Sequence, residues 1–267
     1  MHTEKPFFLR DPWKYDPNGR KSAAPDQELG FDTRALHSGF RPLEDVEEFR
    51  SFAVPIVQSM TYPYECFEKF PNYIYGRSKT PTVSVLEKRL AALEGGEACV
   101  TACSGSQALF QLIFTLARPG DNVVTTLNTF GEGYKQAASI FPERCHVEFR
   151  FVRDFTSLEA WDRAIDGRTK LVWVETPSNP CLQVTDIQGV AEVAHRHGVP
   201  LMVDNTTATP ALQKPMELGA DIVLLSLTKF LCGNATVLGG AVIGPEGLIE
   251  DIRWNTTEFV GAILQPF

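Results

Sequence analysis

The sequence lacks several patterns that would point directly to a function. No apolar run among its 267 residues is long enough to span a bilayer, and the charged start carries no apolar segment typical of a signal peptide. The six cysteines form no CxxC pair and show no zinc-ligand spacing. We therefore expect no membrane partner, no metal site, and reduced thiols in a cytoplasmic protein.

The chain has fewer positive than negative residues, with 25 Lys and Arg residues, 33 Asp and Glu residues and a net charge of -8. Nucleic acids are bound by positive patches, so we expect no nucleic-acid partner. The sequence contains no Walker motif, no GxGxxG motif and no internal repeat. These absences argue against a nucleotide-binding domain.

What the sequence does contain is a regular alternation of strand and helix patterns. The strands are expected at residues 98–102, 122–126, 147–152, 170–175, 201–204, 221–226 and 240–243. The clearest helices are expected at residues 83–93, 105–117, 157–165 and 186–197. This alternation predicts an α/β fold with a mostly parallel sheet flanked by helices, which binds ligands beyond the carboxyl ends of its strands.

The residues before this alternation have a different character. Residues 1–30 are rich in proline and charge, which predicts an extended arm. Residues 52–81 are dense in proline and aromatics and are too aromatic for a disordered linker, so we expect them to pack against a second subunit. We predict an arm and interface segment over residues 1–60 and a ligand-binding large domain over residues 61–267.

The strand predicted at residues 221–226 leads into Lys229, with the hydroxyls of Ser226 and Thr228 just before it. A lysine at the end of a buried strand needs a partner for its ammonium group or must lose its charge. A Schiff base with a carbonyl cofactor meets this need, and pyridoxal phosphate is the usual cofactor of this kind. Lys229 is therefore the first candidate for the chemistry.

Asp204 ends a strand pattern that is otherwise apolar. A desolvated carboxylate seeks a cationic partner, and the protonated pyridine nitrogen of pyridoxal phosphate is such a partner. A helix cap or a contact to a ribose remains open as an alternative for this residue taken alone.

Three further groups follow predicted strands. Gly105 and Ser106 open a helix whose backbone amides favour an anion, although a simple helix cap is an alternative. Asn179 lies in a proline-rich turn and can bond the phenolic oxygen of the cofactor or serve only the turn. Phe130 lies among glycines and can stack on the cofactor ring or belong to the core. The functional interpretation depends on the combination.

In combination, these residues resemble the Cys/Met-metabolism family of fold type I pyridoxal-phosphate enzymes, which includes cystathionine γ-synthase, methionine γ-lyase and the O-acylhomoserine sulfhydrylases. The resemblance runs from about Phe31 to the end of the chain. The motifs that carry it are Tyr75-Gly76-Arg77, Leu93-Glu94-Gly95-Gly96-Glu97, Ser104-Gly105, Glu175-Thr176-Pro177-Ser178-Asn179-Pro180, Val203-Asp204-Asn205-Thr206 and Ser226-Leu227-Thr228-Lys229.

The resemblance implies that Lys229 forms the Schiff base and carries protons. The cofactor-binding residues that it implies are Tyr75, Arg77, Gly105, Ser106, Phe130, Asn179, Asp204, Thr206, Ser226 and Thr228. In the family pattern, Tyr75 and Arg77 reach the phosphate of a neighbouring subunit, so the resemblance also implies a homo-oligomer, either a dimer or a tetramer.

The resemblance implies trans-sulfuration chemistry on a small amino-acid substrate. Phe130 stands where most members have a tyrosine, which favours γ-replacement on an O-acylhomoserine by a sulfhydrylase or a cystathionine γ-synthase and leaves Lys229 as the obvious proton carrier. A γ-lyase acting on methionine or cystathionine is the alternative. Cys232 can be either a reactive thiol or an inert buried one.

Residues 261–267 resemble the stretch that leads into the small C-terminal domain of the family, where the substrate carboxylate is bound. We therefore expect that domain to be absent from this chain, and we expect cofactor binding without efficient turnover by the chain alone. A non-catalytic remnant that binds pyridoxal phosphate is a further possibility.

Overall fold

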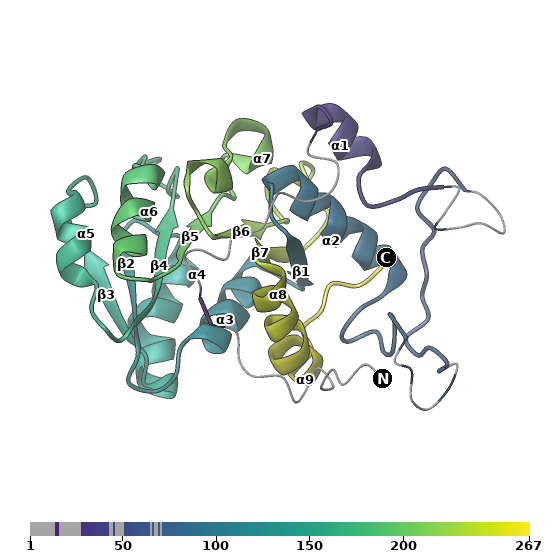
Figure 1. Cartoon of the computed structure of the whole chain (residues 1–267), viewed down its shortest axis with the longest axis horizontal. Helices are drawn as coiled ribbons and strands as arrows, with labels where there is room; N and C mark the ends of the chain where they lie inside the picture. Colours follow the sequence, from purple (N-terminus) through teal and green to yellow (C-terminus); the bar gives the residue numbers. More distant parts are fainter. Residues whose placement is uncertain are drawn as a thin grey trace.

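The computed structural model describes residues 14–15, 28–42, 45, 51–64, 66, 69 and 71–267, and a seven-stranded sheet forms its centre (Figure 1). The strands are β1 (Ala98–Ala102), β2 (Asn122–Thr126), β3 (Glu148–Val152), β4 (Thr169–Glu175), β5 (Leu201–Asp204), β6 (Ile222–Ser226) and β7 (Gly240–Gly244). They are arranged in the order β1-β7-β6-β5-β4-β2-β3. Each lies within a residue or two of the predicted strand.

The sheet is parallel from β3 to β6, whereas β7 runs antiparallel to both of its neighbours, β1 and β6. The reversal follows from the connection, because residues 227–239 contain no helix that could carry the chain back across the sheet. The expected mostly parallel α/β architecture is therefore confirmed, with one reversed strand that continuous apolar patterning does not reveal.

Helices pack on both faces of this sheet (Figure 1). The α-helices are α1 (Phe31–His37), α2 (Pro81–Glu94), α3 (Gly105–Leu116), α4 (Gly131–Lys135), α5 (Leu158–Ala164), α6 (Ile187–Arg196), α7 (Thr209–Leu212), α8 (Glu246–Ile252) and α9 (Glu258–Val260). Wider or tighter turns form η2 (Gln136–Cys145), η3 (Pro215–Leu218) and η4 (Arg253–Thr257).

Capping residues in the sequence set where the main helices begin and end. The Thr80 side chain accepts from the amide of Val83 at the start of α2, and Gly95 ends that helix with a φ of 85°. Ser104 caps α3 and Asp186 caps α6 in the same way. The four clearest predicted helices are thereby confirmed.

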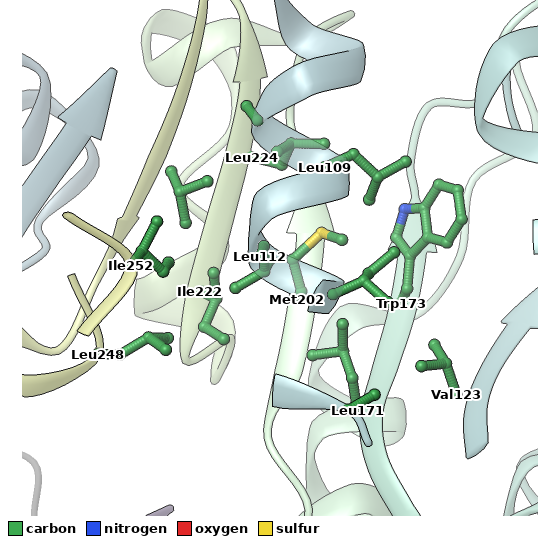
Figure 2. Close-up of a cluster of buried hydrophobic side chains, with 14 of the residues drawn as sticks. Leu109, Leu112, Val123, Leu171, Trp173, Met202, Ile222, Leu224, Leu248 and Ile252 are labelled. Carbon is green, nitrogen blue, oxygen red and sulfur yellow. The ribbon is translucent and has the colours of Figure 1, made fainter. Parts of the chain in front are cut away.

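The core on one face of the sheet is formed mainly by α3 and α8 (Figure 2). Leu109 and Leu112 of α3 lie against Trp173 of β4 and Leu224 of β6, and all four side chains are almost fully buried. Each such side chain stabilises the fold by about 1.5–3 kcal/mol. Helices α5 and α6 cover the opposite face, where Trp161 is buried. The carboxyl ends of the parallel strands are therefore held on a packed framework.

A buried ion pair ties the last turns of the chain to α2. Arg253 donates from Nη2 to Glu87 Oε2 at 2.9 Å and to the carbonyl of Cys99, also at 2.9 Å. Glu87 in turn accepts from the amide of Thr101 in β1. Because both charges are buried and fully bonded, removing either partner would leave the other charge uncompensated.

The expected extended arm at residues 1–30 lies almost wholly outside the described residues. The short helix α1 falls within the predicted arm and interface segment and packs on α2, where Arg34 Nη1 donates to the carbonyl of Ala92 at 2.8 Å. The proline-rich stretch 51–64 forms no helix or strand among its described residues, apart from an isolated bridge between Thr61 and Tyr75. The division at residue 60 remains a prediction.

Within the part of the chain that the structure describes, no helix has the length and apolarity needed to cross a membrane.

Candidate active site

Two buried carboxylates end neighbouring strands at the carboxyl edge of the sheet. Glu175 of β4 pairs in register with Asp204 of β5, and residues paired in parallel strands present their side chains on the same face. Asp204 is 4% exposed and Glu175 is 5% exposed. Asp204 was predicted to lie at this edge, whereas no role was assigned to Glu175.

Burial in this apolar surrounding raises the pKa of both carboxyl groups. The Asp204 charge raises the pKa of Glu175 further, and hydrogen bonds from Thr206 partly oppose the shift at Asp204. A cation at this edge would favour the ionised form of both carboxyl groups, and each group that ionises would bind the cation more tightly. This edge of the sheet is therefore built to receive positive charge.

Thr206 connects the Asp204 strand to the next one. Its amide donates to Asp204 Oδ1 at 3.0 Å, and its hydroxyl oxygen accepts from the amide of Ser226 at 2.8 Å. Thr206 thus holds the carboxyl end of β6 against the carboxyl end of β5. The sequence motif pointed to this threonine, but the contact to Ser226 becomes visible only in the fold.

The helix α3 begins directly beside Ser226. A Cβ built on Gly105 would lie 2.8 Å from the Ser226 Cβ, so only glycine allows this approach. Ser104 Oγ accepts from the Gln107 amide and the Ser104 carbonyl accepts from Ala108, which leaves the first-turn amides of Gly105 and Ser106 without intrahelical acceptors. These amides and the Ser226 hydroxyl are hydrogen-bond donors of the kind that suits an anion.

Glu175 joins the two predicted groups that lie on the other side of the edge. Its Oε2 accepts from the Phe130 amide at 2.6 Å, and its Oε1 accepts from the Asn179 amide at 2.7 Å. The sequence offered one signal that could have identified this residue, because Glu175 ends its apolar strand in the same way that Asp204 ends β5.

Phe130 belongs partly to the core, which was the alternative that the sequence left open. Its ring packs against the buried cluster under α3, and a Cβ on Gly133 would lie 2.8 Å from both Phe130 Cε1 and Trp173 Cη2. The ring is nevertheless half-buried rather than buried. Asn179 is exposed in the turn that follows β4.

The expectation that Lys229 needs a partner because it ends a buried strand is wrong. The lysine lies in a turn three residues after β6, and its side chain is exposed, so burial does not force its ammonium group to find a partner. Within the described residues this ammonium makes no ion pair or hydrogen bond. Its place is fixed through the backbone, where the Lys229 amide donates to the Ser226 carbonyl at 3.3 Å.

Thr228 has a backbone partner that the sequence did not suggest. Its hydroxyl donates to the Gly239 carbonyl at 3.2 Å and accepts from the Gly239 amide at 3.1 Å. A hydroxyl has a single proton to donate, so in this arrangement Thr228 braces the loop rather than offering a donor to an anion.

Tyr75 and Arg77 lie together, but the contacts place them against α9 rather than among the other site residues. The Arg77 guanidinium lies 4.5 Å from the centre of the Tyr75 ring, and its Nε donates to the Glu258 carbonyl at 2.9 Å. The Arg77 side chain is 50% exposed. It can therefore reach outward from this surface.

Cys232 is half-buried close to Lys229 in the chain. Hydrogen bonds from the backbone of Asn234 and Thr236 lower the pKa of its thiol to about 7. The thiol is therefore half-buried rather than buried, and whether it is reactive or inert remains a prediction.

Comparison with known proteins identifies the family. The profile described as "Cys/Met metabolism PLP-dependent enzyme" matches residues 32–267, almost the whole chain. The chain belongs to this family. The assignment confirms the expected family and its pyridoxal-phosphate cofactor class.

Individual members of the family are similar at the level of sequence and structure. The chain is 37% identical to the L-methionine gamma-lyase of Pseudomonas putida over 246 residues, covering 89% of this chain and 61% of that protein. It is 40% identical to the O-acetyl-L-homoserine sulfhydrylase of Corynebacterium glutamicum over 222 residues, covering 80% of this chain and 50% of that protein. The chain therefore spans about half to three fifths of the length of these relatives.

A solved structure supports the expected fold type. The crystal structure of cystathionine gamma-lyase from Lactobacillus plantarum, complexed with L-serine, superposes with a TM-score of 0.82 at 32% identity. The match covers 89% of this chain and 61% of the other. The expected fold type I large domain is thereby confirmed.

Proposed function

We propose that this chain binds pyridoxal phosphate at the carboxyl edge of the sheet. The donor set fits the cofactor, because the free amides at the start of α3 and the Ser226 hydroxyl suit a phosphate. The buried Asp204 suits a protonated ring nitrogen, and the unpaired Lys229 suits an aldehyde. The observation that carries the proposal is that the phosphate-binding donors, the buried carboxyl group and the exposed amine all lie at the carboxyl edge of one sheet.

The remaining residues orient the cofactor. Thr206 keeps Asp204 in place and joins it to Ser226, so the ring-binding and phosphate-binding parts of the site are held at a fixed separation. With the cofactor bound, Phe130 would stack on the ring and the side-chain amide of Asn179 would bond its phenolic oxygen. Thr228 contributes by bracing the loop that carries Lys229.

Pyridoxal phosphate, when bound, supplies an electron sink for a carbanion at the substrate Cα. Lys229 takes the proton from that carbon and delivers it to a neighbouring position, because Phe130 has no acidic or basic group. The substrate that we propose for the whole protein is an O-acylhomoserine, whose γ-substituent is replaced by a sulfur nucleophile.

The cofactor proposal is tested by changing the lysine. We expect the parent protein to bind added pyridoxal phosphate with visible absorption and, after borohydride reduction, to carry a covalent pyridoxyl group on the peptide that contains Lys229. Lys229→Ala should lose the covalent label, because the amine that condenses with the aldehyde is removed. Lys135→Ala is the matched control, since the Lys135 side chain is exposed and donates to the Ser139 hydroxyl at 3.2 Å.

A label on another lysine, or no label in the parent protein, would refute the proposed site. Mass spectrometry of the reduced, digested protein distinguishes these results directly.

A γ-lyase is the second candidate function, favoured by the 37% identity to a methionine gamma-lyase. Sulfhydrylase activity forms homocysteine from an O-acylhomoserine and sulfide and releases the acyl group as a carboxylate. A γ-lyase uses water to convert methionine into a thiol, a keto acid and ammonia. Assays of both reactions with the cofactor-loaded protein separate the two functions. Keto-acid release from methionine without homocysteine formation would favour the lyase.

We also propose that the active protein is a homo-oligomer, in which Tyr75 and Arg77 reach the phosphate bound by a neighbouring subunit. The exposed Arg77 side chain supports this arrangement, because guanidinium groups bind phosphate through two parallel hydrogen bonds. We place this activity in the cytoplasm, since all six cysteines are free thiols.

A further inference from the structure

Glu175 is an acidic residue at the edge of the sheet to which the proposed function gives no role. It is buried, it lies beside Asp204, and it accepts two short hydrogen bonds from backbone amides. Burying a second carboxylate next to the first is costly, so a purely structural role would be served more cheaply by a neutral side chain. The free-energy cost of burying the Glu175 carboxyl group therefore suggests that Glu175 serves a function at this site.

The two amides bonded by Glu175 belong to different segments of the chain. One is the amide of Phe130, which immediately precedes α4, and the other is the amide of Asn179, which lies in the turn after β4. Neither segment shares a strand with Asp204. The Glu175 carboxylate is therefore a bridge between two segments that carry cofactor-facing residues, and the bridge itself is anchored in β4.

We propose that Glu175 is a positioning residue for the cofactor: it ties the backbone of Phe130 to the backbone of Asn179 and holds both residues beside Asp204. The inference rests on the proposed cofactor site. Glu175 acts through these two residues, because its own oxygens are occupied by their amides. Its distances of 2.6 and 2.7 Å are at the short end of the range for hydrogen bonds from amides.

The first test measures the bridge without any cofactor. Glu175→Gln preserves the size of the side chain, but its NH₂ group faces one of the two amides and cannot accept a hydrogen bond from it. We expect at least one of the amides of Phe130 and Asn179 to exchange about tenfold faster with solvent in this variant. Equal exchange rates in parent and variant would overturn the bridge.

Asp121→Asn is the matched control for this substitution. Asp121 also accepts from a backbone amide, that of Arg118 at 2.8 Å, but it lies in the turn before β2, at the opposite end of the sheet. The exchange rates at Phe130 and Asn179 should be unchanged in this variant. Thermal unfolding of both variants verifies that each remains folded before any rate is compared.

The second test links the bridge to the cofactor. Glu175→Gln should weaken the binding of pyridoxal phosphate about tenfold, and it should also weaken the induced circular dichroism of the bound cofactor, because the ring is held less rigidly. Asn179→Ala should weaken binding in the parent protein but have little further effect in the Glu175→Gln background, since the two residues act as one unit.

Additive losses in this double-mutant cycle would overturn the positioning role. If the parent protein binds no pyridoxal phosphate at all, the proposed function falls and the positioning role falls with it. If the parent protein binds the cofactor and Glu175→Gln binds it equally well, only the positioning role fails. The two failures are thus distinguishable.

Discussion

Glu94 is a single buried residue whose hydrogen bonds help to fix the backbone next to the candidate site. It is fully buried at the end of α2, where Asn205 Nδ2 donates to its Oε1 at 3.0 Å. Asn205 is bonded in turn to Gln213, whose Nε2 donates to the carbonyl of Thr176 at 2.8 Å. The network therefore fixes the residues that directly follow Asp204 and Glu175.

Burial raises the pKa of Glu94 from 4.5 to about 7, so the folded protein keeps a proton here that the unfolded chain has already lost. Stability should therefore fall as pH rises from about 4.5 to about 7, by up to about 3 kcal/mol, and remain at the lower level above that range. Glu94→Gln should abolish this part of the decline, which urea unfolding at several pH values measures.

The control for the Glu94 prediction is Glu192→Gln, which changes an exposed glutamate that accepts from a neighbouring amide side chain, that of Gln188, on α6. Its pH profile should follow that of the parent. An unchanged profile in Glu94→Gln would show that Glu94 is not the titrating group.

At the scale of one residue, the sequence predicted which residues lie near the candidate site better than it predicted their exposure and hydrogen-bond partners. Asp204 was correctly expected to end a buried strand, because an apolar run that closes on a carboxylate is a local pattern. The exposure of Lys229 and the pairing of Thr228 with Gly239 depend on how a turn folds back, and no local pattern encodes that. Glu175 was visible in the sequence, but its role depends on the register between two strands.

At the scale of the element, β7 is the strand that shapes the site. It lies between β1 and β6, and its first residue packs against the turn that precedes α3. Its position in the sequence was predicted, but its direction was not, because apolar patterning is the same in either direction. The reversed strand brings Gly240 directly against Ser104 and so sets where α3 begins.

Gly240→Ala is expected to destabilise the protein by about 2–3 kcal/mol. A Cβ at this position would lie 2.2 Å from the carbonyl oxygen of Ser104 and 2.7 Å from the amide of Gly105, and these backbone atoms cannot yield easily. Gly167→Ala is the control, because nothing lies within 4 Å of its added Cβ. Denaturant unfolding of both variants measures the difference; equal stability would mean that α3 can shift away from β7.

At the scale of the whole molecule, the question is whether one chain completes a site. The contacts gather most of the predicted residues at one edge of the sheet, whereas Tyr75 and Arg77 form a separate pair against α9. The family resemblance already set these two groups apart, because it assigned Tyr75 and Arg77 to the phosphate of a neighbouring subunit; that assignment remains a prediction.

Mixing two deficient variants tests whether Arg77 acts across subunits. Arg77→Ala alone should bind pyridoxal phosphate weakly, and Lys229→Ala alone should form no reducible covalent attachment. A mixed dimer would contain one site with Lys229 from the first chain and Arg77 from the second. We therefore expect the mixture, after exchange of subunits, to regain tight and reducible binding in part of its sites.

Titration of the mixture with pyridoxal phosphate, followed by borohydride reduction, measures this recovery. Binding no tighter than that of Arg77→Ala alone would mean that Arg77 serves its own chain. Mixing Arg77→Ala with the parent protein provides the reference for the number of tight sites.

The pairing of Thr228 with Gly239 has a consequence for how the chain can change over time. The two hydrogen bonds join the two ends of the loop between β6 and β7, which contains Lys229 and Cys232. The tip of this loop, at residues 233–238, is exposed. A substitution confined to the tip therefore changes none of the groups that make these two hydrogen bonds. We expect such variants to keep the spacing between β6 and β7 while the surroundings of the Lys229 amine change.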